Sequence, residues 1–257
     1  MYTQEIQLST KLVADKEKLY IEFHSLLISF RNNGQVQGDS ENLYFDDDKI
    51  CSSVITLAKD ALHKKYNTPL IDKRITSIEE LANTKIQIKS SGKLYINEAE
   101  VCECTKSEHY ILFTTFLDFS SPVRCGTCNH NVPLYRLPLF NEYGYQDILH
   151  WESNYKAFDT LQMNCTVGEK WAMKQMWDVD SQLSKQGIEI CKKITELSQI
   201  PTYYYLFNYK SIRHSQDIKR KCPFCGGEWL LKEKTYHLYD FKCDTCKLIS
   251  SLSSNSF

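Results

Sequence analysis

The sequence contains few of the residues that dominate loop-rich or fibrous chains, and it contains no long apolar run. Its 257 residues include nine Gly and six Pro, which is too few for a chain built mainly of loops. No stretch of about 18 apolar residues is present, and Glu5 stands where a secretory signal would need positive charge. We therefore expect a cytoplasmic protein that does not bind a membrane.

Sequence motifs of the common enzyme classes are also missing. We find no Walker phosphate loop, no glycine fingerprint for dinucleotides, no nucleophile elbow and no His-Glu-x-x-His helix. Three consecutive acids, Asp46 to Asp48, are more typical of a solvated turn than of a magnesium site. The sequence therefore predicts a binding protein, not an enzyme, and no small-molecule substrate.

Net charge is small, but it is unevenly distributed. The formal value of -1 excludes a uniformly basic surface for nucleic acid. Residues 201–257, however, carry nine Lys and Arg against five Asp and Glu. Any electrostatic contact with a polyanion must therefore come from a local patch near the C-terminal end.

Apolar periodicity predicts an α+β protein with four parts. Residues 1–100 predict a small mixed sheet with helices on one face, and residues 101–140 predict a zinc-stabilised knuckle segment. Residues 141–200 predict a pair of helices, and residues 201–257 predict an aromatic strand followed by a zinc ribbon.

Several individual elements can also be placed. Asp15 is expected to cap a helix that ends at Gly34, and the acidic turn is expected to join two strands of a hairpin. The other expected elements are a short helix at 78–81, a strand at 110–116, helices at 147–163 and 167–197, and a strand at 203–209.

Cysteine is the most informative residue type that is present in quantity. An odd total of eleven, with several C-x-x-C spacings, fits metal binding in a reducing compartment better than a disulfide framework. The most typical array is C-x2-C-x17-C-x2-C, followed after its first pair by two glycines and flanked by apparent hairpin strands. It predicts one structural Zn2+ bound by Cys222, Cys225, Cys243 and Cys246.

A second cysteine set has less familiar spacing. Alternate residues of an extended segment point to the same side, so the first pair could converge with a C-x-x-C knuckle on one ion. This predicts a second zinc site at Cys102, Cys104, Cys125 and Cys128. The alternatives are reduced buried cysteines, or a site in which His109 or His130 replaces one thiolate. The unpaired Cys51, Cys165 and Cys191 are expected to be small buried side chains.

A basic connector precedes the C-terminal array. Five cations in this connector are candidate phosphate contacts: Lys210, Arg213, Lys219, Arg220 and Lys221. Aromatic rings at alternate positions from Tyr203 to Tyr209 could provide a stacking surface for single-stranded nucleic acid, although we favour a place in the sheet core for them.

The residues around these cysteines resemble a known family. Similar segments include PVRCGTCNHNVPLYRLP (122–138), CPFCGGEWLL (222–231) and FKCDTC (241–246), with RNNGQV (31–36) near the N-terminus. Together they resemble an uncharacterised bacterial family described as zinc-ribbon-containing, with a suggested role in nucleic-acid binding. The resemblance extends over almost the whole chain, supports both cysteine sets as ligands and implies no reaction.

Two hypotheses about function follow from the sequence. The leading hypothesis is a zinc-binding protein that binds nucleic acid through the basic connector. The alternative is an immunity protein that neutralises a protein toxin, using the acidic surface of the first 200 residues against a basic partner.

Overall fold

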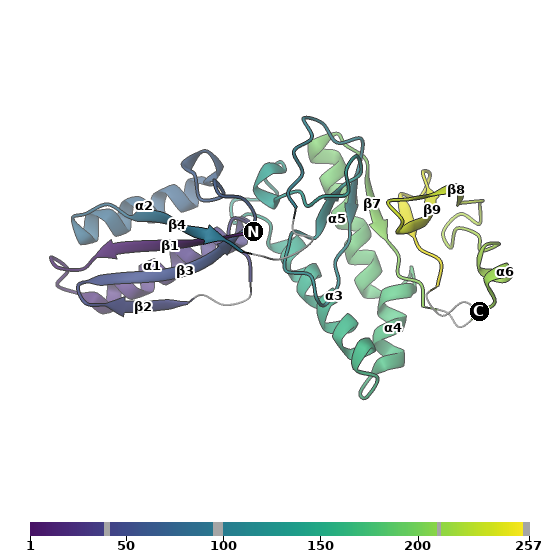
Figure 1. The fold of residues 1–257 in the computed structure, drawn as a ribbon, viewed down its shortest axis with the longest axis horizontal. Helices are drawn as coiled ribbons and strands as arrows, with labels where there is room; N and C mark the ends of the chain where they lie inside the picture. Colours follow the sequence, from purple (N-terminus) through teal and green to yellow (C-terminus); the bar gives the residue numbers. More distant parts are fainter. Residues whose placement is uncertain (39–41, 95–99, 210–211, 254–257) are drawn as a thin grey trace. The chain divides into compact units, whose positions relative to one another are not determined.

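The computed structural model describes residues 1–38, 42–94, 100–209 and 212–253, and these divide into two compact units. Unit 1 comprises residues 1–101, 119–121 and 130–146, and unit 2 comprises residues 102–118, 122–129 and 147–257. Each unit has its own sheet with helices (Figure 1), which confirms the expected α+β class.

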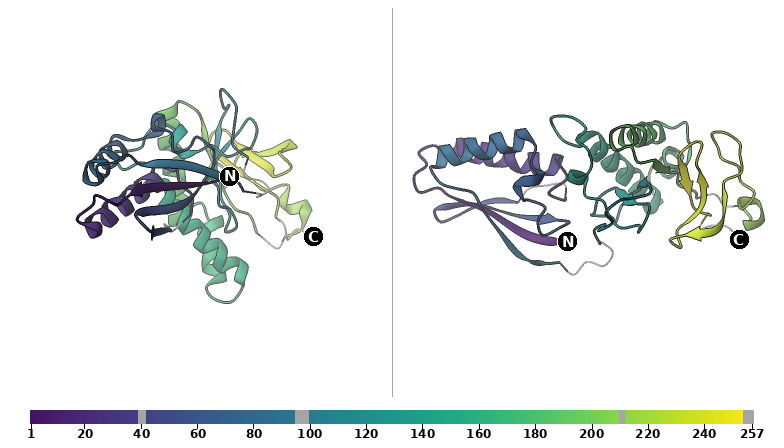
Figure 2. Two further views of the ribbon diagram at one scale, coloured as in Figure 1. Left: turned by 60° about the vertical axis from the view of Figure 1, so that its left-hand side comes forward. Right: turned by 90° about the horizontal axis from the view of Figure 1, so that it is seen from above.

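Unit 1 is a four-stranded antiparallel sheet with two helices on one side (Figure 2). The strand order is β2-β3-β1-β4, so the chain follows the βαββαβ path of ferredoxin-like folds. Its elements are β1 (Tyr2–Ser9), α1 (Lys16–Asn32), β2 (Leu43–Asp46), β3 (Lys49–Thr56), α2 (Pro69–Ala82) and β4 (Gln87–Lys93).

Short-range signals determine where the helices of unit 1 begin and end. The side chain of Asp15 accepts a hydrogen bond from the amide of Lys18 at 2.9 Å, which confirms the expected cap of α1. The expected hairpin is also present, with β2 and β3 joined through Asp47. The expected helix at 78–81 is the end of a longer one, because Thr68 caps α2 and Pro69 occupies its first turn.

Two later segments of the chain return to unit 1. The amide of Tyr145 donates to the carbonyl of Asn32, the last residue of α1, at 2.7 Å. Gly34 has a φ of +70°, and a Cβ there would lie 2.6 Å from Cβ of Leu134. Glycine is therefore needed both for the turn after α1 and for the close approach of the 3₁₀ turn Leu134–Arg136. A second 3₁₀ turn, Lys64–Tyr66, precedes α2.

Unit 2 has a six-stranded sheet in the order β6-β5-β7-β10-β9-β8. The strand β7 pairs in parallel with both β5 and β10, and the outer pairs are antiparallel. Its strands are β5 (Tyr110–Leu112), β6 (Val123–Cys125), β7 (Thr202–Tyr205), β8 (Leu230–Thr235), β9 (Tyr239–Cys243) and β10 (Leu248–Ser250). The expected strands at 110–116 and 203–209 are therefore both shorter than predicted.

The helices of unit 2 are α3 (Gln146–Asn164), α4 (Glu169–Trp177), α5 (Gln182–Ser198) and the short α6 (His214–Asp217). The expected helix over 147–163 is present as α3. The expected helix over 167–197 is wrong as a single element, because the chain turns between α4 and α5. Ser181 caps α5 by accepting a hydrogen bond from the amide of Ser184 at 3.0 Å.

Consecutive tyrosines of β7 face opposite sides of the sheet. Tyr204 packs against Trp151 of α3 and Gly187 of α5, which runs alongside β7 (Figure 1). On the other side, Tyr203 and Tyr205 belong to a buried apolar cluster and are 3% and 7% exposed. Tyr203 and Tyr205 lie in the sheet core, as favoured from the sequence. Phe207 and Tyr209 instead follow β7, are half-buried and stack on each other with ring centroids 6.0 Å apart.

Within the residues that the structure describes, none of the helices is both long and apolar enough to cross a membrane.

Candidate functional site

The structure brings each predicted cysteine set together in unit 2. Within each set the four Sγ atoms all lie within 4.8 Å of one another. We call these sets the central cluster (Cys102, Cys104, Cys125, Cys128) and the C-terminal cluster (Cys222, Cys225, Cys243, Cys246). All eight cysteines are free thiols, and each cluster could hold one metal ion.

The C-terminal cluster is assembled from two tight turns. In the first turn, the Gly226 amide donates to the Cys222 carbonyl at 2.8 Å, and the Cys222 amide donates to the Gly227 carbonyl at 2.9 Å. Gly226 has a φ of +70°, the conformation expected of a glycine in a metal knuckle. Cys243 ends β9, and its Sγ accepts a hydrogen bond from the amide of Cys246 at 3.4 Å.

The sulfur spacing in this cluster suits a tetrahedral ion. Cys225 Sγ lies 3.7 Å from Cys243 Sγ. Four sulfurs bound tetrahedrally at about 2.3 Å would lie about 3.8 Å apart. The residues present therefore fit a four-thiolate site.

The central cluster contains the four predicted cysteines and neither of the two alternative histidines, His109 and His130. Cys125 ends β6, and its Sγ lies 3.1 Å from Ser107 Oγ and 3.4 Å from the amide of Thr127. His109 instead packs against Gly126 and the ring of Tyr203, while His130 Nε2 lies 3.1 Å from a carboxylate oxygen of Glu100. Four cysteines, without a substituting histidine, form the central cluster.

Hydrogen bonds adjust the acidity of one thiol in each cluster. The backbone amide of Gly227 and the neighbouring cysteines lower the pKa of Cys225 to about 7. Burial raises the pKa of Cys125, but hydrogen bonds from Ser107, Thr127 and neighbouring thiols outweigh burial and bring the pKa to about 6. Burial raises the pKa values of Cys102 and Cys222. Each cluster thus combines a buried thiol with one that ionises readily, and a thiolate is the form that binds metal.

The two clusters share one sheet. Both β6 and β9 run antiparallel to β7, and each ends in a cluster cysteine, Cys125 and Cys243. The tip of the β8–β9 hairpin also reaches the knuckle of the central cluster, where Tyr236 Oη donates to the carbonyl of Gly126 at 2.7 Å. Tyr239 Oη donates to Asn129 Oδ1 at 3.4 Å. The C-terminal ribbon is therefore an integral part of unit 2.

The basic connector is divided by burial into two kinds of residue. Arg213, which caps the N-terminus of α6, and Lys219 are exposed. Lys221 is also exposed and forms an ion pair with Glu228 beside the cysteine turn. Lys210 lies outside the described residues. Three of the five predicted cations are thus available at the surface.

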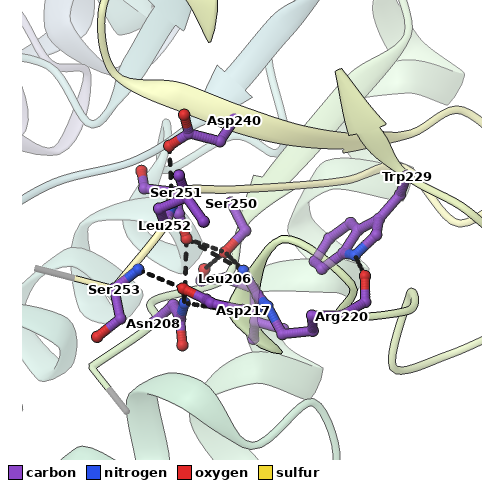
Figure 3. A network of polar contacts seen from close by, with 10 residues as sticks. All are labelled: Leu206, Asn208, Asp217, Arg220, Trp229, Asp240, Ser250, Ser251, Leu252 and Ser253. Carbon is purple, nitrogen blue, oxygen red and sulfur yellow. Dashed lines mark hydrogen bonds and ion pairs between the residues drawn. The ribbon is translucent and has the colours of Figure 1, made fainter. Parts of the chain in front are cut away.

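Arg220 is different, because its side chain points inward, toward Asp217 and the residues after β10 (Figure 3). Its guanidinium contacts Asp217 at 3.3 Å and donates to Ser250 Oγ and the Ser251 carbonyl at 3.2 and 3.1 Å. It also lies over the rings of Trp229 and Phe241, 4.9 and 4.4 Å from their centroids. Its Nη2 donates within the protein and its side chain is only 16% exposed, so the structure gives no support to Arg220 as a phosphate contact.

Asp217 is the buried partner in this network. Its side chain is 0% exposed and accepts from the amide of Ser253 at 2.7 Å and from Asn208 Nδ2 at 3.2 Å. Trp229 Nε1 donates to the carbonyl of Arg220 at 2.8 Å. These contacts join the basic connector, the ribbon and the chain after β10 (Figure 3).

One exposed ring near the cations was not identified from the sequence. Phe224 stands between Cys222 and Cys225 and is 61% exposed. Its position inside a C-x-x-C turn was a usable signal, because such a turn has little room to bury a large side chain. Among the unpaired cysteines, Cys51 and Cys191 are buried as expected, whereas Cys165 is exposed.

Comparison with known proteins assigns the chain to a family. Residues 1–92, 104–207 and 212–256 match three families, each described as a domain of unknown function (DUF8589, DUF2310 and DUF8594, in that order). An uncharacterised protein of Haemophilus influenzae is 30% identical over 236 residues, which is 90% of each chain. A second uncharacterised protein of that organism is 36% identical over 159 residues, covering 62% of this chain and 78% of the relative.

The chain therefore belongs to an uncharacterised bacterial family, as the sequence resemblance predicted. No solved structure matches it. The boundary between the second and third domain matches falls inside unit 2, where β5 to β7 and β8 to β10 form a single sheet. The two domains are thus one structural body in this chain.

Proposed function

We propose that the protein is a non-enzymatic, zinc-binding protein that binds nucleic acid through the exposed cations of its basic connector. Each cysteine cluster holds one structural Zn2+ in this proposal. The observation that carries it is the inward anchoring of Arg220, which holds Lys219 and Lys221 at the surface beside the C-terminal cluster.

Zinc is the metal that suits the donors. Four cysteine thiolates at tetrahedral spacing form a closed zinc site, in which every coordination position is filled by protein. A closed site leaves no position for water or substrate, which supports a structural role for the metal.

Nucleic acid is the partner that suits the exposed charge. Arg213, Lys219 and Lys221 are exposed along one short stretch, in a C-terminal region that carries a net positive charge. Lysine and arginine bind phosphates regardless of base sequence, and they release counterions when they do so. Because Asp217 and Arg220 hold this stretch against the ribbon, its cations need little ordering when they bind.

The test is fluorescence anisotropy of labelled oligonucleotides titrated with the zinc-loaded full chain at several salt concentrations. The variant Arg213→Ala/Lys219→Ala/Lys221→Ala should weaken binding, and losing three phosphate contacts should reduce the slope of log K against log salt concentration by about 2 for a single strand. A matched control, Lys170→Ala/Lys185→Ala/Lys192→Ala, removes three exposed cations from α4 and α5 and should bind as the wild type does. Absence of binding at low salt would refute the proposal.

The alternative role as an immunity protein stays a prediction. It would be favoured if the wild-type protein bound no oligonucleotide at low salt but bound and neutralised a basic protein toxin.

A further inference from the structure

Phe224 is an exposed aromatic ring within the proposed binding surface. Among the Phe, Tyr and Trp side chains within the described residues 212–253, only that of Phe224 is exposed. Trp229, Tyr239 and Phe241 are buried, and Tyr236 is half-buried. Removing a phenylalanine ring from water is favourable, so a ring left 61% exposed contributes little to the core.

The backbone holds this ring in a restricted position. Phe224 lies between two cluster cysteines, Cys222 and Cys225, and the turn is closed by the hydrogen bond from Gly226 to Cys222 at 2.8 Å. Pro223 restricts the backbone further, because the pyrrolidine ring of proline fixes its φ. A partner that covers Phe224 therefore has to order very little of the protein.

Cations flank the ring at short separations along the chain. Lys221 is three residues before Phe224, and its Nζ pairs with Glu228 on the other side of the same turn. Lys219 is two residues earlier and exposed. A flat apolar ring beside positively charged side chains is the combination that binds unpaired bases and their phosphates together. In a duplex the faces of the bases are stacked on one another, so a side chain cannot stack on them without unstacking a step.

We infer that Phe224 stacks on an unpaired base of a single-stranded nucleic acid whose phosphates contact Lys219 and Lys221. This inference rests on the proposed nucleic-acid binding and specifies its substrate class. In this inference, the turn from Cys222 to Cys225 distinguishes single strands from duplexes, while the two lysines contribute affinity for both.

The experiment compares labelled single strands of about 12 nucleotides, as DNA and as RNA, with the matching duplexes. Phe224→Leu keeps an apolar side chain at the turn but removes the aromatic face. It should weaken single-strand binding by about 5- to 150-fold, the range that corresponds to loss of one stacked base, and leave duplex binding unchanged. Phe224→Tyr keeps the ring and should restore the affinity.

Two controls separate loss of stacking from loss of structure. Leu230→Ala alters another exposed apolar residue of the ribbon and should bind as the wild type does. The zinc content and melting temperature of Phe224→Leu should match those of the wild type. If they do not, the single-strand affinity of Phe224→Tyr, which keeps the ring, is compared with that of the wild type instead.

The possible failures are distinguishable. If the wild type binds neither single strands nor duplexes, the proposed function fails. If the triple cation variant loses binding but Phe224→Leu does not, or if single strands and duplexes bind equally, the proposed function stands and this inference is overturned.

Discussion

Adjacent residues with the same charge have opposite roles in the basic connector. Lys219 and Lys221 extend into solvent, whereas Arg220 between them lies in a polar network with Asp217. The difference follows from the planar guanidinium, which can donate several hydrogen bonds and also stack on Trp229 and Phe241. A run of basic residues can therefore contain both exposed cations and internal anchors.

Replacement of the anchor is expected to destabilise unit 2. Arg220→Ala should lower the free energy of unfolding by about 3 kcal/mol, because it leaves the carboxylate of Asp217 buried without its cation. Urea denaturation of the zinc-loaded protein measures this loss. Asp217→Asn/Arg220→Ala should lose less free energy of unfolding than the sum of the losses in Asp217→Asn and Arg220→Ala. Additive losses would contradict the coupling between these two side chains.

Glu228 offsets one of the exposed cations. Glu228→Gln should strengthen binding of oligonucleotides at low salt, because Lys221 is then free of its anionic partner. The free energy of unfolding should change by less than about 1 kcal/mol, since the pair is exposed. Anisotropy titration measures the first effect and urea denaturation the second. Glu233→Gln, on exposed β8, is the matched control, and equal gains in both variants would point to net charge alone.

At the scale of elements, the break between α4 and α5 shows what helical periodicity does not reveal. Apolar residues recur at helical spacing across 167–197, and the chain still turns between Trp177 and Gln182. The amide of Asp180 donates to Asp178 Oδ1 at 3.0 Å, and Ser181 starts the next helix. Local side-chain hydrogen bonds of Asp and Ser compete with helix continuation, and they decide the outcome here.

Loss of the α5 cap has a defined expected effect. Ser181→Ala should lower the free energy of unfolding by about 1 to 2 kcal/mol, because Ser181 Oγ accepts from the Ser184 amide and donates to the Gln175 carbonyl. Ser181→Thr keeps the hydroxyl and should retain most of that stability. The measurement is thermal or urea unfolding followed by circular dichroism. Equal stability of the alanine and wild-type proteins would show that the cap is dispensable.

At the scale of the whole molecule, all eight cluster cysteines belong to one unit. Each cluster takes one cysteine from a strand of the same six-stranded sheet, and the contact from Tyr236 to Gly126 joins their turns. Both units have an apolar core, which in unit 1 is formed by residues such as Phe23, Leu26 and Ile50. If the clusters hold metal as proposed, unit 2 should depend on that metal in addition to its apolar core.

Metal removal should reveal this difference. A strong chelator should abolish most hydrogen-exchange protection in β5 to β10, because binding of a structural zinc supplies folding free energy directly. Protection in β1 to β4 should persist, since the described part of unit 1 contains neither cysteine cluster. Added Zn2+ should reverse the loss. Unchanged protection in both units would contradict a structural role for the metal.

Short-range information was sufficient for much of the fold and of the site. The sequence by itself determined the grouping of eight cysteines into two sets, the cap of α1, the hairpin through Asp47 and the α+β class. Each of these depends on residue spacing or on local periodicity. The inward turn of Arg220 and the pairing of β10 with β7 were decided by tertiary structure alone. These features depend on partners distant in sequence, since only the folded chain brings Ser250 and Ser251 to Arg220 or places β10 beside β7.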